Sequence, residues 1–263
     1  MIRCYALHSK KKSLDICEAF AQGCGGVVES VHEPNLKDGD CFFYGVRPDW
    51  LHLWGQAKRE KRTIYYADNS YYDCVREKQF RVTRNGLQCD GMRAIWNDEG
   101  AKRFEALGVK IQDWRRDGSH IVIAPQSEEF TRVVAGYAGN WLDDAVAAIR
   151  RHTDRPLRIR KKGESRPLVA DLDGAWCLVT HMSCAAVEAL LAGVPVFVTG
   201  RSAAQIMGLS DLSMIETPEY PDRRQEFFEL LAANQWSMDE LRSGVTWRAF
   251  EEQRLHGVAH YGY

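Results

Sequence analysis

One stretch of the chain combines a polar turn with the start of a short helix, and its residue types could bind an anionic ligand. Residues 177–179 are apolar and strand-like, and Ser183 is a favourable helix N-cap. Gly193 and then Pro195 end the helix. A helix that begins directly after a strand directs free N–H groups and the positive end of its dipole toward a ligand. We therefore expect a phosphate-binding turn at Ser183.

Glu188 is the second residue of interest in this stretch. It lies five residues beyond Ser183, which is about 7–8 Å along a helix axis and close to the distance from a diphosphate to a ribose. Cys184 and Ala185 share its helix face and are small, so a ligand could approach there. A carboxylate inside so apolar a helix is costly unless it is paired or used. The alternative is an ordinary strand–helix–strand unit with Glu188 at its rim.

Residues 180–198 resemble the nucleotide-binding signature of the GT-B glycosyltransferases. In that family a polar turn at a helix start holds the diphosphate of a nucleotide sugar, and a Glu followed by Ala, Gly and Pro accepts the ribose hydroxyls. The resemblance implies that a nucleoside-diphosphate sugar, expected to be a UDP-sugar, is bound by His181, Ser183, Cys184 and Glu188. It also implies that transfer needs no metal ion.

Two further strand ends carry candidate donor-binding residues. Arg160 and Lys162 alternate to one side of a strand predicted at 157–160, and in the family such positions contact the donor phosphates. Ser127 follows the strand predicted at 121–124, in a loop that flanks the donor in this family. The alternatives are a solvated basic loop and a plain turn.

The first half of the chain contains two polar and aromatic runs, at 65–73 and 80–86. Both resemble segments of phage and bacterial capsule-type glycosyltransferases that face the cleft between the domains. The resemblance implies that the acceptor is bound by Asn69, Tyr71, Arg81 and Arg84. An inverting transfer needs a general base, and we expect Asp68 in this role, with Asp73 as the second choice and His181 as the third. The alternative for Asp68 is a turn-capping side chain.

Two acceptor classes stay open. The phage-like resemblance implies duplex DNA with 5-hydroxymethylated pyrimidines, whose flipped base could stack on Tyr71 and Tyr72. A surface polysaccharide is the alternative acceptor. The alternative functions are a non-catalytic nucleotide-sugar-binding protein and a nucleotide-sugar epimerase.

Several other classes of site are not predicted. Asp171 and Asp173 form an Asp-x-Asp motif, but an Asp-Gly turn follows directly, so we expect no metal there. None of the eight cysteines forms a Cys-x-x-Cys pair or a zinc-type spacing with histidine. The net charge is −1, which gives no overall attraction to nucleic acid or to an anionic membrane. The sequence has no signal peptide or apolar run long enough for a bilayer, so we expect a cytoplasmic protein without membrane insertion.

The elements that must position these residues alternate between strand and helix. Strands are predicted at 2–7, 27–28, 40–44, 63–66, 79–83, 121–124, 157–160, 176–180 and 194–198, and helices at 13–23, 49–59, 98–107, 139–151, 184–192, 223–233 and 238–252. This alternation predicts an α/β fold with parallel sheets. With the resemblance, it implies a GT-B-like protein of two Rossmann-like domains with an interdomain cleft. Residues 1–117 would bind the acceptor, and residues 118–263 would bind the nucleotide sugar, with C-terminal helices crossing back.

Overall fold

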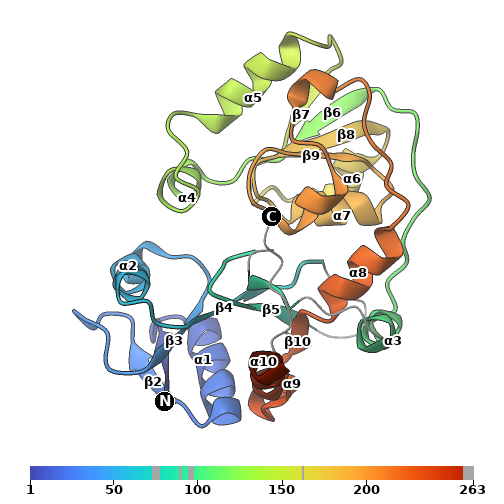
Figure 1. Cartoon of the computed structure of the whole chain (residues 1–263). Helices are drawn as coiled ribbons and strands as arrows, with labels where there is room; N and C mark the ends of the chain where they lie inside the picture. The colour runs from blue at the N-terminus through green and yellow to red at the C-terminus, as the bar shows by residue number, and fades with distance from the viewer. Residues whose placement is uncertain (73–77, 89–90, 94–97, 162, 257–263) are drawn as a thin grey trace. The chain divides into compact units, whose positions relative to one another are not determined.

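The computed structural model describes residues 1–72, 78–88, 91–93, 98–161 and 163–256. The chain divides into two compact units, each with its own sheet (Figure 1). Unit 1 contains residues 1–108 and 229–263, and unit 2 contains residues 109–228. The first unit ends nine residues before position 117, because the following segment pairs with unit 2. There, the amides of Gln112 and Arg115 donate to the carbonyls of Leu191 and Gly193.

The sheet of unit 1 has the strand order β10-β5-β4-β3-β1-β2 within the described residues. Its parallel part consists of β1 (Ile2–Ala6), β2 (Val27–Ser30), β3 (Asp40–Tyr44) and β4 (Ile64–Asn69). Two antiparallel strands extend it, β5 (Gln79–Arg84) and β10 (Gln235–Ser237). Parallel strands need crossover connections, and helices supply two of them.

Helices cover both faces of this sheet (Figure 1). Successive strand residues point to opposite faces, so Phe42 and Phe43 of β3 enter different cores. Phe42 stacks on Phe20 of α1 (Lys11–Cys24), with the ring centroids 4.0 Å apart. Phe43 stacks on Trp50 of the short helix η1 (Pro48–Trp50), which leads into α2 (Leu51–Arg59).

The last part of the chain returns to unit 1. Its first element there is the second half of α8 (Arg224–Ala232), followed by β10. Two helices, α9 (Met238–Arg242) and α10 (Val245–His256), then pack on α1. A single helix was predicted at 238–252, but Gly244 has φ +78° and separates the two. The side chain of Arg103, on α3 (Asp98–Leu107), ties this segment down by donating to the carbonyls of Ala232 and Gln235.

Unit 2 has a fully parallel sheet in the order β7-β6-β8-β9. Its strands are β6 (His120–Ile123), β7 (Leu157–Ile159), β8 (Ala175–Thr180) and β9 (Val196–Val198). Its helices include α4 (Glu128–Val133), α5 (Trp141–Arg150), α6 (Leu168–Leu172) and α7 (Ala185–Leu191), with the short helices η3 (Ala203–Met207) and η4 (Leu212–Met214). The core of this unit joins apolar residues of β6, β8 and β9 to one face of α5.

The prediction of an α/β fold with parallel sheets is confirmed, and most predicted elements are present. The sequence analysis missed α4, α6 and β10, which have only six, five and three residues. Elements this short span too few repeats for a hydrophobic period to be visible.

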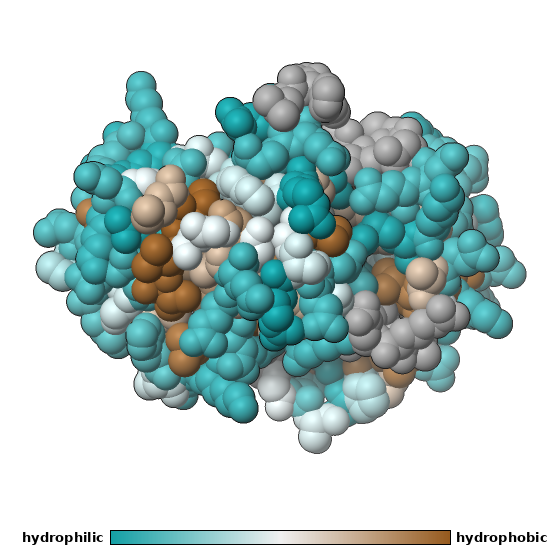
Figure 2. All heavy atoms as spheres, turned by 90° about the horizontal axis from the view of Figure 1, so that it is seen from below, coloured by the Kyte–Doolittle hydropathy of each residue, from teal (hydrophilic) through white to brown (hydrophobic). Residues whose placement is uncertain are grey.

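The apolar residues of the described chain are concentrated in these cores. The exposed large apolar side chains are scattered, at Met1, Val27, Ile159, Val169, Met214 and Val245. Hydrophilic residues cover most of the face drawn in Figure 2, with brown apolar patches between them. Among the described residues, none of the helices combines the length and the apolar character that crossing a membrane requires.

Candidate functional site

The carboxyl ends of the parallel strands of unit 2 lie along one edge of its sheet, where ligands of such folds bind. The hydroxyl of Thr180 donates to the carbonyl of Ala124 at 2.5 Å, which joins the end of β8 to the loop after β6. At the start of α5, Trp141 packs on His181, with the ring centroids 5.9 Å apart. Three segments far apart in the sequence therefore meet at this edge.

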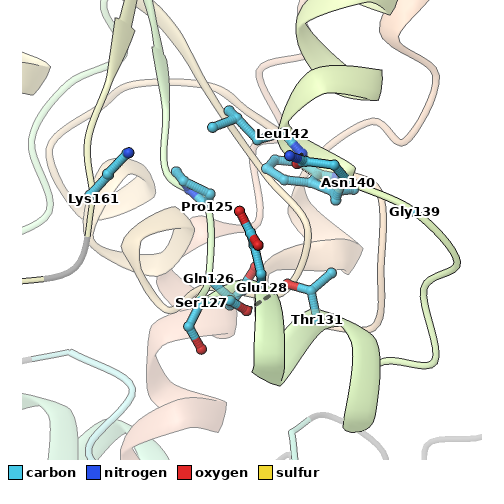
Figure 3. Close-up of a pocket in the computed structure, with 10 residues that line it drawn as sticks. Pro125, Gln126, Ser127, Glu128, Thr131, Gly139, Asn140, Leu142 and Lys161 are labelled. Carbon is cyan, nitrogen blue, oxygen red and sulfur yellow. Dashed lines mark hydrogen bonds between the residues drawn. The ribbon is translucent and has the colours of Figure 1, made fainter.

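A cavity of about 330 Å³ lies at this edge of unit 2 (Figure 3). It is lined by Pro125, Gln126, Ser127, Glu128, Thr131, Gly139, Asn140, Trp141, Leu142 and Lys161. Pro125, Trp141 and Leu142 supply apolar surface. Glu128 directs its carboxylate into the cavity, and Lys161 lies on the opposite side of Pro125 from Asn140 (Figure 3). The volume is at the lower end of the range for small-molecule sites.

Ser127 lies in the cavity wall, in the loop where the sequence analysis expected a donor contact. Its Oγ caps α4 by accepting a hydrogen bond from the amide of Phe130 at 3.3 Å. This bond uses only a lone pair, so the hydroxyl hydrogen can still be donated to a ligand. Asn140 caps α5 in the same way, because its Oδ1 accepts from the amides of Leu142 and Asp143.

The turn before α7 differs from the expectation in one respect. The helix begins at Ala185, so Cys184 rather than Ser183 occupies the N-cap position. Ser183 Oγ accepts from the amide of Ala185 at 3.2 Å, and the Ser183 carbonyl accepts from the amide of Ala186. The Ser183 amide donates to Thr180 Oγ1 at 3.3 Å. Three amides expected to face a phosphate are thus engaged within the chain.

Glu188 is exposed on α7, beside the partly exposed Cys184 and Ala185. The argument that its carboxylate must be used because it is buried is therefore wrong, since a solvated carboxylate carries no such cost. Contact of Glu188 with a ribose stays a prediction.

His181 is held in one orientation next to the cavity. Its ring is 8% exposed and packs against Tyr137 and Trp141. Trp141 Nε1 donates to Thr199 Oγ1 at 2.8 Å, and His181 Nδ1 lies 3.0 Å from the same oxygen. A Cβ added at Gly200 would lie 2.6–2.8 Å from three atoms of the imidazole, so the ring rests directly on the backbone there.

These contacts define the chemistry that His181 can perform. Burial lowers the pKa of His181 below its ordinary value of 6.5, so the ring is neutral at pH 7. The Thr199 hydroxyl accepts from the indole and still has one hydrogen and one lone pair, so it can either donate to His181 Nδ1 or accept from it. In the tautomer in which Thr199 donates, the ring proton is on Nε2 and can be donated to an anionic ligand.

The basic residues after β7 do not lie as predicted. Arg160 donates to the buried Asp171 at 2.6 Å, and Arg166 also pairs with this carboxylate. Arg160 is therefore part of a structural ion pair, which competes with the expected phosphate contact. β7 ends at Ile159, so the strand alternation used to select Arg160 and Lys162 is not supported beyond that residue, and Lys161 is one of the residues that line the cavity. Lys162 lies outside the described residues.

In unit 1, Asp68 and Asn69 end β4, as expected, but both are engaged. Asp68 Oδ2 accepts from Tyr66 Oη at 2.7 Å and from Arg81 at 2.9 Å. Asn69 Oδ1 accepts from Lys12 Nζ at 2.6 Å. Asp68 therefore holds the buried guanidinium of Arg81 in place. Its role as a general base stays a hypothesis. Asp73, the second candidate base, lies outside the described residues.

The proposed acceptor contacts of Tyr71 and Arg81 do not agree with the structure. Tyr71 is 0% exposed and Arg81 is 5% exposed, with the guanidinium over the Tyr71 ring at 5.5 Å. Both side chains belong to the interior of unit 1, so neither can reach a bound acceptor in this conformation. Tyr72 is equally buried, whereas Arg84 at the end of β5 is partly exposed.

The sequence analysis missed four side chains at the edge of unit 2: Glu128, Asn140, Trp141 and Thr199. Asn140 could have been predicted as a helix N-cap, because an Asn that precedes an apolar-periodic run is typical of a helix start. The contact of Trp141 with Thr199 joins residues 58 positions apart, and no local pattern encodes it.

No protein-family model matches this chain, and no curated protein matches its sequence. Two solved structures from Thermosulfurimonas dismutans are similar over most of their length. KpsC, beta Kdo 2,4 transferase, has a TM-score of 0.53 and 11% identity, covering 88% of this chain and 89% of that one. KpsC, beta Kdo 2,7 transferase, has a TM-score of 0.51 and 13% identity, covering 94% and 99%.

The chain has a GT-B-like fold. The predicted fold class is thereby confirmed for both units, since the similarity extends over unit 1 and unit 2 alike. At identities of 11% and 13% the likeness establishes the fold alone. Function has to be argued from the site.

Proposed function

We propose that this protein is a glycosyltransferase that uses a nucleotide-activated sugar. The observation that carries the proposal is the likeness to two Kdo transferases over 88% and 94% of the chain, with a cavity at the carboxyl edge of the unit 2 sheet. A fold shared along nearly the whole length supports a common sheet edge, which is where ligands of such folds bind. The function as such still needs an enzymatic test.

The donor side of the proposed reaction belongs to unit 2. Lys161 supplies positive charge at the cavity, and Ser127 and His181 supply neutral hydrogen-bond donors. Donors and cations at this point stabilise the negative charge that develops on a departing nucleotide. Glu188 is the proposed partner of the ribose hydroxyls. In this scheme the leaving group is stabilised by the chain's own residues, so transfer proceeds without a metal ion.

The acceptor side belongs to unit 1, and we propose a glycan hydroxyl as the acceptor. Both similar structures carry Kdo transferase in their names, which supports a sugar acceptor for this chain. A hydroxymethylated DNA base loses its main support, because Tyr71 and Tyr72, expected to stack on the base, are buried. Asp68 and Asp73 remain the proposed general bases.

The experiment is a transfer assay with the full chain. UDP-sugars and nucleotide-activated Kdo are each incubated with a capsule-type oligosaccharide and with hydroxymethylated duplex DNA, and products are read by mass spectrometry. We expect a sugar added to the oligosaccharide, with the same yield after chelation of divalent metals. Sugar on the DNA alone would overturn the glycan acceptor, and release of no nucleotide from any donor would overturn the proposed function.

A variant pair tests the donor site. Glu188→Gln should weaken donor binding by about 1–3 kcal/mol if the carboxylate accepts ribose hydroxyls. Glu105→Gln, an exposed helical glutamate of unit 1, is the matched control and should bind the donor like the parent chain. Equal donor affinity in all three proteins would remove Glu188 from the site.

A further inference from the structure

The side chain of Gln126 has buried polar atoms that lower the stability of the folded state. Its carboxamide nitrogen Nε2 and oxygen Oε1 are both inaccessible to solvent, and neither has a hydrogen-bond partner within the described part of the chain. A buried polar atom without a partner destabilises the folded state by about 1–3 kcal/mol. Such groups are rare in native proteins, and one at a binding cavity points to a partner that is supplied by a ligand.

The backbone holds this carboxamide at the cavity. Gln126 follows Pro125, whose φ is fixed by its ring, and precedes Ser127, the N-cap of α4. The carbonyl of Ser127 accepts from both the amide and the hydroxyl of Thr131, at 3.0 and 3.1 Å. On the other side, Ala124 is tied to β8 in both directions. A ligand therefore meets a preformed loop and does not have to order it.

The chemistry of the unpaired group defines its ligand. A carboxamide presents one acceptor and two donor hydrogens side by side in a plane. Its complement is a planar group with an acceptor and a donor on the same edge. A nucleobase has this pattern on its pairing edge, whereas an ordinary trans amide directs its N–H and C=O to opposite sides. The cavity adds apolar surface from Pro125, Trp141 and Leu142 for such a planar group, and Lys161 for a nearby negative charge.

We propose that Gln126 is a ligand-recognition residue that pairs with a planar donor–acceptor edge bound in the cavity of unit 2. The nucleobase of the donor nucleotide supplies such an edge. The inference rests on the proposed function only in assigning the cavity to the donor side. The unpaired carboxamide needs a ligand whatever reaction the chain catalyses.

The test uses Gln126→Met, which keeps the length of the side chain and removes its hydrogen bonds. Calorimetric titrations of the full chain use uridine 5′-monophosphate and cytidine 5′-monophosphate. We expect at least one of these to bind, with an affinity about tenfold lower in the variant, as the loss of two hydrogen bonds implies. The nucleotide that responds identifies the base. Gln112→Met, at an exposed position of the same unit, should bind like the parent.

Urea unfolding supplies the second readout. Because the unliganded chain makes no bond to the carboxamide, Gln126→Met should be at least as stable as the parent. Lower stability would show that Gln126 already has a partner in the free protein and would overturn the inference. So would unchanged affinity for both nucleotides, or binding of neither. A weakened affinity in a chain that transfers no sugar would support this site while contradicting the proposed function.

Discussion

Thr199 is a single hydroxyl on which two aromatic side chains of unit 2 depend. It accepts from the indole of Trp141 and contacts Nδ1 of His181. Thr199→Val keeps the shape but leaves the nearly buried indole N–H without an acceptor, so we expect the free energy of unfolding to fall by about 1–3 kcal/mol. Urea denaturation followed by tryptophan fluorescence measures this. Thr199→Ser keeps the hydroxyl and should lose less. Equal losses in the two variants would mean that the hydroxyl contributes nothing.

The lowered pKa of His181 makes the stability of the protein depend on pH. The unfolded chain, in which the ring titrates at its ordinary value of 6.5, binds a proton before the folded chain does. The contribution of His181 to the free energy of unfolding is therefore fully present above pH 6.5, and it is lost as the pH falls from 6.5 through the pKa of the folded state. Between pH 7.5 and 5.5, the parent should lose more unfolding free energy than His181→Gln. Imidazole proton shifts in NMR spectra give the folded pKa directly, and a value above 6.5 would contradict this account.

At the scale of elements, two helical glycines have opposite roles. Gly23 lies in α1 where α9 approaches, and a Cβ there would lie 2.1 Å from the carbonyl oxygen of Leu241. Gly55 lies inside α2, where a Cβ would meet only the tip of Arg59 at 3.3 Å. Alanine favours a helix over glycine by about 1 kcal/mol, so Gly55→Ala should stabilise. Gly23→Ala should destabilise by about 1–3 kcal/mol, because backbone has to move.

Thermal unfolding of the two single variants checks this pair. The opposite signs are the prediction, since helix propensity alone would give both substitutions the same sign. A stabilising Gly23→Ala would mean that α1 and α9 do not approach each other as closely as the structure shows.

The elements that were predictable from the sequence are those whose pattern is local. In β3, Phe42 and Phe43 follow each other in an apolar run, and a strand with helices on both faces accounts for both. Glycine correctly indicated the end of α7 at Gly193, which has φ +76°, whereas α1 was predicted to end at Gly23 and in fact continues to Cys24, before Gly25 at φ +67°. These features require no knowledge of distant residues.

The features that escaped prediction depend on partners far along the chain. β10 has three residues and exists because Trp236 pairs with Phe80. Tyr71 was expected to contact the acceptor, but the amide of Tyr71 donates to Gln235 and its ring faces Arg81, so the side chain is buried. Lys161 lines the cavity although its neighbours Arg160 and Lys162 were the predicted residues, because β7 ends one residue before Arg160.

At the scale of the whole molecule, unit 1 is assembled from both ends of the chain. Residues 229–256 supply an edge strand and two helices to the unit formed by residues 1–108. Trp236 and Phe250 from this segment are both 0% exposed. The side chain of Asn234 pairs in both directions with the backbone of Arg93, at 2.7 and 3.0 Å. Unit 1 is therefore incomplete until the last segment has been added.

Truncation tests this dependence. A chain ending at residue 228 removes every contact of the segment, whereas a chain ending at residue 256 retains all the described ones. Losing a single buried Trp or Phe side chain costs about 3–5 kcal/mol, and a domain has only about 5–15 kcal/mol of stability. We expect the shorter chain to lose the near-ultraviolet circular dichroism and the cooperative unfolding of unit 1, and the longer one to retain both. Cooperative, parent-like unfolding of unit 1 in the shorter chain would show that residues 1–108 fold alone and that residues 229–256 are not required for their folding.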